Sequence, residues 1–187
     1  IDAVDRFHGS VIRFSGDGIT AWFAGEDSAT RAATASLAMQ AVSRTLQPAL
    51  PNLQIKIGIG SGQTRRFRPG DPALGVYDVL TGPAVEQMSQ AEGLARPGQI
   101  VLSPAASAEL GRRFEQQPLR DGFSLLSTRT LADLLSEARR WPSIRWLDHV
   151  ERAWELVEAC RPYLPAPIYE RLAGGRGTYM ADLRTVT

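Results

Sequence analysis

The chain has 187 residues, and its 21 Lys and Arg against 20 Asp and Glu give a formal net charge of +1. This balance creates no global field of the kind that marks nucleic-acid-binding proteins or proteins of anionic membrane surfaces. The single cysteine, Cys160, excludes an intrachain disulfide and a cysteine zinc cluster and fits a reducing compartment such as the cytoplasm, and no apolar run reaches the ~20 residues of a membrane helix.

A β-hairpin is the first pattern along the chain, in the stretch SVIRFSGDGITAWF at about 10–24. Apolar β-formers such as Phe14 and Trp22 flank the pair Asp17-Gly18. Asp-Gly between two apolar runs is the strongest short-range hairpin signal. We therefore expect two buried strands, tied to the core through their aromatic side chains, with the Asp17 carboxylate at the end of a tight turn.

An Ala-rich helix is expected next, at 29–46, with Asp27-Ser28 as its N-cap. Residues 53–59 then alternate Leu and Ile with Gln, Lys and Gly. This is the period-two pattern of a strand with one apolar face. The basic stretch RRFRPGDPALG indicates a loop, because Pro and Gly dominate it, and YDVL indicates a short strand.

Helix and strand continue to alternate up to about residue 127. PAVEQMSQAEGLA has a helical pattern, RPGQIVLS indicates a turn and a strand, and Ser103 followed by Pro104 is the expected start of another helix. A further strand pair is expected around Asp121-Gly122. This order predicts an α+β fold, in which helices pack on an antiparallel sheet.

The character of the sequence changes near Thr130, where the amphipathic stretches TLADLLSEARRW and LDHVERAWELVEACRPYL begin. We expect a first domain at 1–129, a helical linker at 130–180, and the first strand of another domain at 181–187. The opening residues IDAVDRFHG are typical of the end of a helix already under way, so we expect the chain to be part of a longer protein.

Four landmarks in fixed order carry a resemblance to a known family: IRFSGDGITAWF, IKIGIGSGQ, YDVLTGPAVEQMSQAEGLARPGQIVLS and, at the end, ADLRTVT. Over about 1–127 the chain resembles the class III adenylate/guanylate cyclase catalytic domain, most of all that of the soluble-type tandem cyclases. The resemblance implies a ferredoxin-like antiparallel sheet with helices packed on it, here without the first strand and helix of the domain. It also implies that ADLRTVT opens a second cyclase domain of the same full-length chain.

The resemblance implies conversion of ATP to cyclic AMP and pyrophosphate, with two Mg²⁺ or Mn²⁺ ions per site held by two aspartates at a domain interface. One aspartate matches Asp17, which is thereby the expected catalytic and metal-binding residue. The other belongs to the family's first strand, and we expect it upstream of Ile1. Ser15, Gly16 and Lys56 match positions expected to bind the nucleotide triphosphate.

The positions that serve the other face of such a site depart from the family pattern. The hairpin Lys is Arg13, a base-reading position is Val79, the Asn position is Glu86 and the Arg position is Gln90. These residue types cannot orient a ribose or stabilise the transition state. We therefore expect a metal-donating half that leaves base recognition to a second cyclase domain, that is inactive as this fragment, and whose substrate is ATP or GTP. Bicarbonate sensing is not implied, because the expected anion-holding Arg is Ser89.

Other interpretations of the same residues stay open. Asp17 can serve only the turn, and Lys56 on a half-exposed strand can be a solvated charge. For the whole chain, the alternative is a catalytically degenerate cyclase-fold domain with a regulatory or dimerising role. A nucleotidyl-transferase-like palm domain is a third, less favoured reading. An aspartate upstream of Ile1 would favour catalysis over the regulatory role. A nucleic acid or a membrane is not an expected partner.

Overall fold

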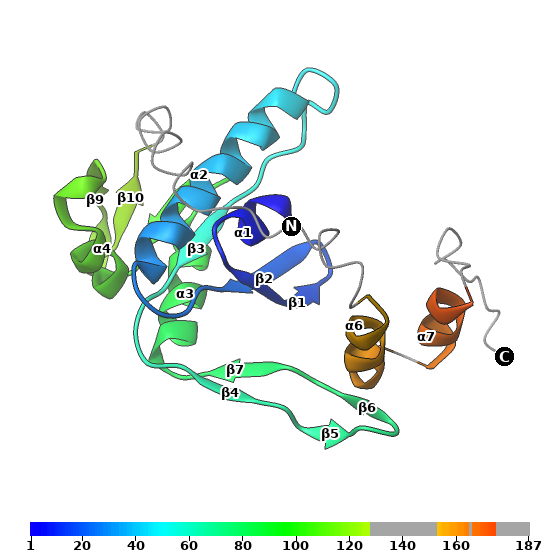
Figure 1. The fold of residues 1–187 in the computed structure, drawn as a ribbon. Helices are drawn as coiled ribbons and strands as arrows, with labels where there is room; N and C mark the ends of the chain where they lie inside the picture. Colours follow the sequence, from blue (N-terminus) through cyan, green and yellow to red (C-terminus); the bar gives the residue numbers. More distant parts are fainter. Residues whose placement is uncertain (128–152, 165, 175–187) are drawn as a thin grey trace, which may run out of the picture. The chain divides into compact units, whose positions relative to one another are not determined.

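The computed structural model describes residues 1–127, 153–164 and 166–174, which fall into two compact units (Figure 1). The first unit contains 1–66 and 80–127, and the second contains 67–79 with the described C-terminal residues. The predicted domain boundaries at 129 and 180, the helix predicted at 130–141 and the strand predicted at 181–187 lie outside the described residues. No described helix has both the length and the apolar character needed to cross a membrane.

The main sheet of the first unit has four strands in the order β3 (Ile57–Ile59), β8 (Ile100–Leu102), β10 (Ser124–Leu126) and β9 (Gln116–Pro118). The predicted α+β class is confirmed. The pairs β8–β10 and β10–β9 are antiparallel, but β3 and β8 are parallel. The expectation of an antiparallel sheet is therefore corrected for this one pair, because a helix connects β3 to β8 and such a crossover returns the chain in the same direction.

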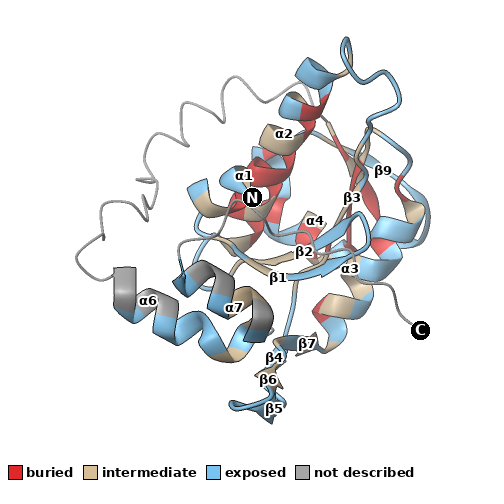
Figure 2. Cartoon of the chain, turned by 90° about the vertical axis from the view of Figure 1, so that its right-hand side faces the viewer, coloured by how far each residue is buried: buried red, intermediate tan, exposed pale blue. Residues whose placement is uncertain are grey.

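Both faces of the sheet are covered by helices. On one face α2 (Ser28–Leu46) and α4 (Pro104–Leu110) share a core cluster with Ile100 and Leu102, whereas α3 (Pro83–Leu94) packs on Val101 from the other face. The alternation follows from the period of two in a strand. Figure 2 shows the resulting buried stripe along α2 and the buried central strands.

Helix α3 lies unusually close to β3 because two glycines face it. A Cβ on Gly58 would lie 2.3 Å from the backbone nitrogen of Glu92, and one on Gly60 would lie 2.2 Å from the carbonyl oxygen of Ala84. These glycines therefore allow backbone-to-backbone packing, as glycines inside strands often do. The strand itself is shorter than predicted, since it includes only Ile57–Ile59 of the expected 53–59.

The predicted hairpin is present as β1 (Ser10–Ser15) and β2 (Gly18–Trp22), preceded by the short helix α1 (Asp2–Arg6). It forms a two-stranded sheet of its own, without ladder pairing to the four-stranded sheet. The expectation of two buried strands is wrong: Phe14 and its cross-strand neighbour Ile19 are 60% and 52% exposed. Phe23, just after β2, does pack into a buried cluster against α2.

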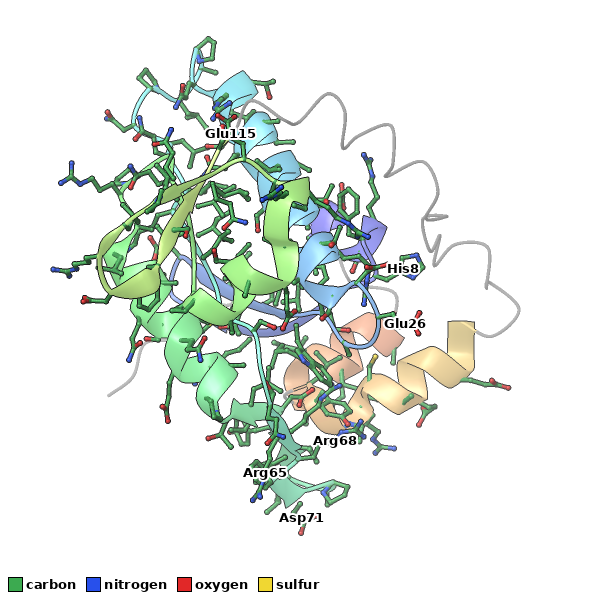
Figure 3. All side chains as sticks on the ribbon, turned by 90° about the vertical axis from the view of Figure 1, so that its left-hand side faces the viewer. His8, Glu26, Arg65, Arg68, Asp71 and Glu115 are labelled. Atoms are coloured by element: carbon green, nitrogen blue, oxygen red, sulfur yellow. The ribbon has the colours of Figure 1, made fainter. Side chains whose placement is uncertain are left out.

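The stretch predicted as a basic loop is an extended β-arm instead. β4 (Arg65–Phe67) pairs with β7 (Val79–Thr81), and β5 (Gly70–Asp71) pairs with β6 (Gly75–Val76). Figure 3 labels Arg65, Arg68 and Asp71 along this arm. The Pro and Gly residues that suggested a loop lie at the turns and at ends of these very short strands.

Helix capping agrees with the sequence at one predicted start and differs at another. The Ser103 hydroxyl accepts a hydrogen bond from the Ala106 amide at 3.2 Å, as predicted for the N-cap of α4. Asp27 does precede α2, but it has a φ of 54° and its side chain caps no amide. Two 3₁₀ turns, η1 (Gly111–Arg113) and η2 (Arg120–Gly122), complete the described part of the first unit.

In the second unit the described helices are α6 (Ala153–Cys160), η5 (Arg161–Tyr163) and α7 (Ala166–Ala173). α6 falls within the stretch predicted to be an amphipathic helix. Tyr169 donates a hydrogen bond to Glu158 at 2.5 Å, and this bond raises the pKa of the tyrosine hydroxyl above its ordinary value. Arg161 lies over the Tyr169 ring, 5.3 Å from its centroid. This cluster joins α7 to the preceding helix.

Candidate functional site

Asp17 is at the far end of the β1–β2 hairpin, in a loop of two residues. Ser15 pairs with Gly18, so the loop consists of Gly16 and Asp17, one position earlier than the Asp-Gly signal indicates. Gly16 has a φ of 60° and Asp17 does not have a positive φ. A positive φ at only the first loop residue is the pattern of type II′ hairpins, in which Gly is preferred there.

The Asp17 side chain is open to ligands. Ser15, Gly16 and Asp17 are all exposed, and within the described part of the chain the Asp17 carboxylate has no hydrogen bond or ion pair. The hairpin therefore presents a carboxylate and the backbone of a glycine together, which is the arrangement that a metal-bound phosphate can approach. A hard oxygen donor of this kind suits Mg²⁺ or Mn²⁺.

One carboxylate does not make a complete metal cage. Among residues 1–127, 153–164 and 166–174, no group of three or more His, Cys, Asp and Glu side chains could hold a metal ion. Within the described residues, Asp17 can therefore contribute at most one carboxylate group to a metal site. The role of Asp17 as one of two metal-binding aspartates stays a prediction.

Lys56, the predicted phosphate contact, directly precedes β3 and forms an ion pair with α3. Its Nζ lies 2.7 Å from Glu92 Oε1, and the two side chains are 43% and 48% exposed. Pairs exposed to this extent contribute only about 0–1 kcal/mol. Lys56 is therefore held by a weak partner that an anion can replace, and no contact in the described residues joins it to Asp17.

The four positions that depart from the expected family pattern, which are Arg13, Val79, Glu86 and Gln90, are solvent-exposed. Val79 in β7 is 41% exposed, and Glu86 and Gln90 lie four residues apart on the exposed side of α3, next to exposed Ser89. Residues four apart on a helix are neighbours on one face. The α3 surface thus presents a carboxylate and an amide, with no arginine beside them. Arg13, on the hairpin, is exposed and pairs with Thr20.

Two buried polar residues of α2, which the sequence reasoning missed, hold the segments that carry Asp17 and Lys56. Gln40 is 2% exposed and donates through Nε2 to the carbonyl oxygen of Ile55 at 2.9 Å, directly before Lys56. Arg31 is 6% exposed and donates only to carbonyl oxygens. The sequence did contain a signal for these two contacts, since Arg31 and Gln40 are long polar residues among the small side chains of the Ala-rich helix.

The Arg31 guanidinium contacts both ends of the hairpin. Nη1 donates to Phe7 O at 3.3 Å and to His8 O at 2.9 Å, just before β1. Nη2 donates to Ala24 O and, at 3.1 Å, to Glu26 O, just after β2, and Nε donates to the same Glu26 oxygen at 3.3 Å. His8 and Glu26 are labelled in Figure 3.

A hollow of about 390 Å³ lies at the N-terminal end of α2, away from these positions in the sequence. Its lining includes Asp27 and Glu109, and Arg113, which lies 3.6 Å from the Asp27 carboxylate. Glu109 also accepts a hydrogen bond from Ser61 at 2.5 Å. None of the predicted site residues lines this hollow, and its charged groups already have partners.

A search of protein-family models and of curated protein sequences finds no match to this chain. Solved structures do match. The catalytic core of a rhodopsin-guanylyl cyclase with converted specificity, in complex with ATPalphaS, is 24% identical with a TM-score of 0.59, over 68% of this chain and 76% of that one. The guanylate cyclase domain of RhGC from Catenaria anguillulae, in complex with GTP, is 21% identical with a TM-score of 0.56, over 67% and 75%.

The adenylyl cyclase CyaB from P. aeruginosa is 17% identical with a TM-score of 0.56, over 67% of this chain and 74% of that one. At these identities the likeness establishes the fold. About two thirds of the chain therefore has the α+β fold of adenylyl and guanylyl cyclase catalytic domains.

Proposed function

We propose that this chain is the metal-donating half of a tandem class III nucleotidyl cyclase, which converts ATP to cyclic AMP and pyrophosphate at an interface with a second cyclase domain. The observation that carries the proposal is the exposed, unpartnered Asp17 carboxylate at the end of a hairpin in a cyclase fold. Two of the similar structures contain ATPalphaS or GTP, which supports a nucleotide triphosphate as the substrate class.

In this proposal each hairpin residue has a defined task. Asp17 provides one carboxylate ligand to the metal site, and Ser15 and Gly16 let the backbone approach the triphosphate without a bulky side chain. Lys56 exchanges Glu92 for a phosphate oxygen. When bound, two Mg²⁺ or Mn²⁺ ions supply charge stabilisation at the phosphates and activation of the ribose 3′-hydroxyl.

Base recognition and transition-state stabilisation fall to the partner domain. Glu86 is negatively charged where a neutral amide would be needed, and Gln90 has no positive charge for the developing phosphate charge. Val79 offers no hydrogen bond to a base. Because the base-reading residues are supplied by the partner, GTP is the alternative substrate, and activity requires both domains.

The cytoplasm, where nucleotide triphosphate is available, is the proposed location. The proposed partners are the nucleotide and a second cyclase domain. Neither a nucleic acid nor a membrane is a proposed partner.

A second candidate function is a catalytically degenerate cyclase-fold domain that regulates or dimerises. The same exposed Glu86 and Gln90 favour it, because neither side chain can stabilise the negative charge of a transition state. The two functions differ in what they require of Asp17. A regulatory domain tolerates loss of the Asp17 charge, whereas a metal-donating half does not.

The test compares full-length wild-type protein with Asp17→Asn and with the matched control Asp121→Asn. Both aspartates are exposed turn residues of the first unit, and asparagine is as good a turn former. Cyclic nucleotide formation is measured with ATP and with GTP, in Mg²⁺ and in Mn²⁺. We expect Asp17→Asn to lower turnover by about 10²-fold or more, a barrier increase of about 2.7 kcal/mol.

The control variant should stay within about threefold of wild type, which is a difference of under about 1 kcal/mol. If Asp17→Asn is also within that range in an active enzyme, Asp17 serves only the turn and the metal-donating role is refuted. If the wild-type protein forms no cyclic nucleotide from either substrate, the regulatory function is favoured.

A further inference from the structure

Arg31 is a charged side chain buried in α2, and its partners are all backbone carbonyl groups. It is 6% exposed, and among the described residues no carboxylate forms an ion pair with it. Burying a charge is costly unless it is fully hydrogen-bonded. Carbonyl oxygens at Phe7, His8, Ala24 and Glu26 provide that compensation. The position of the Arg31 guanidinium is therefore set by these four carbonyl groups.

These four carbonyl groups belong to the two ends of one hairpin. Phe7 and His8 lie two to three residues before β1, and Ala24 and Glu26 lie two and four residues after β2. His8 has a φ of 56°, so its carbonyl direction depends on a conformation that L-residues seldom adopt. The guanidinium thus fixes the entry and the exit of the hairpin at one point.

The hairpin needs such an anchor because the main sheet does not hold it. β1 and β2 pair only with each other, and the four-stranded sheet begins with β3. Besides the Arg31 contacts, two others lie at the base of the hairpin. Phe23 packs with Phe7 and Ala35, and the Arg66 guanidinium lies over the Trp22 ring, 5.3 Å from its centroid. The position of the hairpin, and with it that of Asp17, depends on this base.

We propose that Arg31 is a positioning residue that holds the β1–β2 hairpin, and therefore Asp17, against α2. The effect of Arg31 on metal binding by Asp17 rests on the proposed function, whereas the anchoring of the hairpin by Arg31 does not. Arginine is required because its donors Nε, Nη1 and Nη2 point in fixed, divergent directions and all are used here. Lysine would keep the charge but could not reach both ends of the hairpin.

The experiment uses the full-length protein and the conservative variant Arg31→Lys, with two controls. Arg44→Lys makes the same change at an exposed position of the same helix, and Leu110→Ala removes a buried side chain of α4 far from the hairpin in sequence. Amide hydrogen exchange is measured on peptides from 10–23 and from 100–126. The half-saturating Mn²⁺ concentration for cyclic nucleotide formation is measured in parallel.

We expect Arg31→Lys to speed exchange in 10–23 by about tenfold or more, while exchange in 100–126 changes by less than about threefold. Leu110→Ala should speed exchange in 100–126 and leave exchange in 10–23 nearly unchanged. Arg44→Lys should leave exchange in both segments unchanged. A displaced Asp17 carboxylate is a poorer metal ligand, so the half-saturating Mn²⁺ concentration should rise in Arg31→Lys alone.

Unchanged exchange in 10–23 overturns the anchoring role. Faster exchange there with an unchanged Mn²⁺ response in an active enzyme overturns the positioning of Asp17 and leaves the proposed function intact. If the wild type is inactive, the proposed function fails, and exchange alone decides the anchoring role.

A measurement on wild-type protein covers the case in which Arg31→Lys unfolds. Amide hydrogen exchange is measured while the denaturant concentration is raised below the unfolding transition. Peptides from 10–23 and from 24–31 should lose protection together, because the Arg31 guanidinium joins the two segments. Opening of 10–23 at lower denaturant than 24–31 overturns the proposal.

Discussion

Replacing Gly58 with alanine tests how closely β3 packs against α3. The added Cβ would lie 2.3 Å from the backbone nitrogen of Glu92 and 2.6 Å from the carbonyl oxygen of Met88. Comfortable heavy-atom contacts begin near about 3.5 Å, so the methyl group lacks about 1 Å on both sides. Both obstacles are helix backbone, and no rotamer change relieves them. The strand and the helix must therefore separate.

This separation has a predictable cost. Overpacking a well-packed core costs about 1–3 kcal/mol, and we expect about 3 kcal/mol here because the clash is with backbone. Moving α3 outward also loosens the buried cluster under it, which contains Ala91, Ala95, Val101 and Phe123. The Lys56–Glu92 ion pair adds little to this cost, since both side chains are about half exposed.

Gly93→Ala is the matched control for this change. Gly93 is in the same helix, is exposed, and a Cβ there would have no atom within 4 Å. Gly93 is the penultimate residue of α3, so the control should be neutral or stabilising by at most the helix-interior value of about 0.5–1 kcal/mol. Urea unfolding followed by far-ultraviolet circular dichroism gives both values. A loss below about 1 kcal/mol for Gly58→Ala would contradict the close packing of β3 and α3.

Three further predictions follow from the same structure. The 187-residue chain alone should form no cyclic nucleotide from ATP or GTP with Mg²⁺ or Mn²⁺, and product above an Asp17→Ala control would refute this. Lys56→Met should raise the KM for the nucleotide while changing the free energy of unfolding by less than about 1 kcal/mol, because the ion pair with Glu92 is about half exposed. An unchanged KM would contradict a phosphate contact of Lys56. Ser103→Ala should lower the free energy of unfolding by about 1 kcal/mol, measured by urea unfolding, because the Ala106 amide loses its cap; no loss would show that the cap is dispensable.

The sequence predicted those features that depend on neighbouring residues. The hairpin, the Ala-rich helix and the Ser103 cap are encoded within a few residues each, and all three are present. The turn was displaced by one position because both Gly16-Asp17 and Asp17-Gly18 fit short hairpin loops. The arm around β5 was missed because strands of two residues leave almost no periodic pattern.

Features that depend on distant partners could not be predicted. Exposure of Phe14 depends on what packs beside the hairpin, and an apolar strand pattern alone indicates burial. Arg31 contacts carbonyl groups up to 24 residues away, and backbone carbonyls have no signature in a sequence. In the candidate site, Asp17 is exposed and its metal-binding role stays a prediction, whereas Lys56 has an acidic neighbour, Glu92, that its strand did not reveal.

The isolation of the hairpin also has a consequence for the order of folding. β1 and β2 pair within a few residues, which takes about 1–10 μs, whereas β3 and β8 join Ile57 to Ile100 and must first close a long loop. A lone two-stranded hairpin is only marginally stable, so it should form early and reopen until α2 receives it. During this interval Phe14 and Ile19 are exposed to solvent, and both stay more than half exposed in the native structure. Pulsed hydrogen exchange during refolding should therefore show lasting protection of 10–23 only together with α2, and earlier protection would contradict this order.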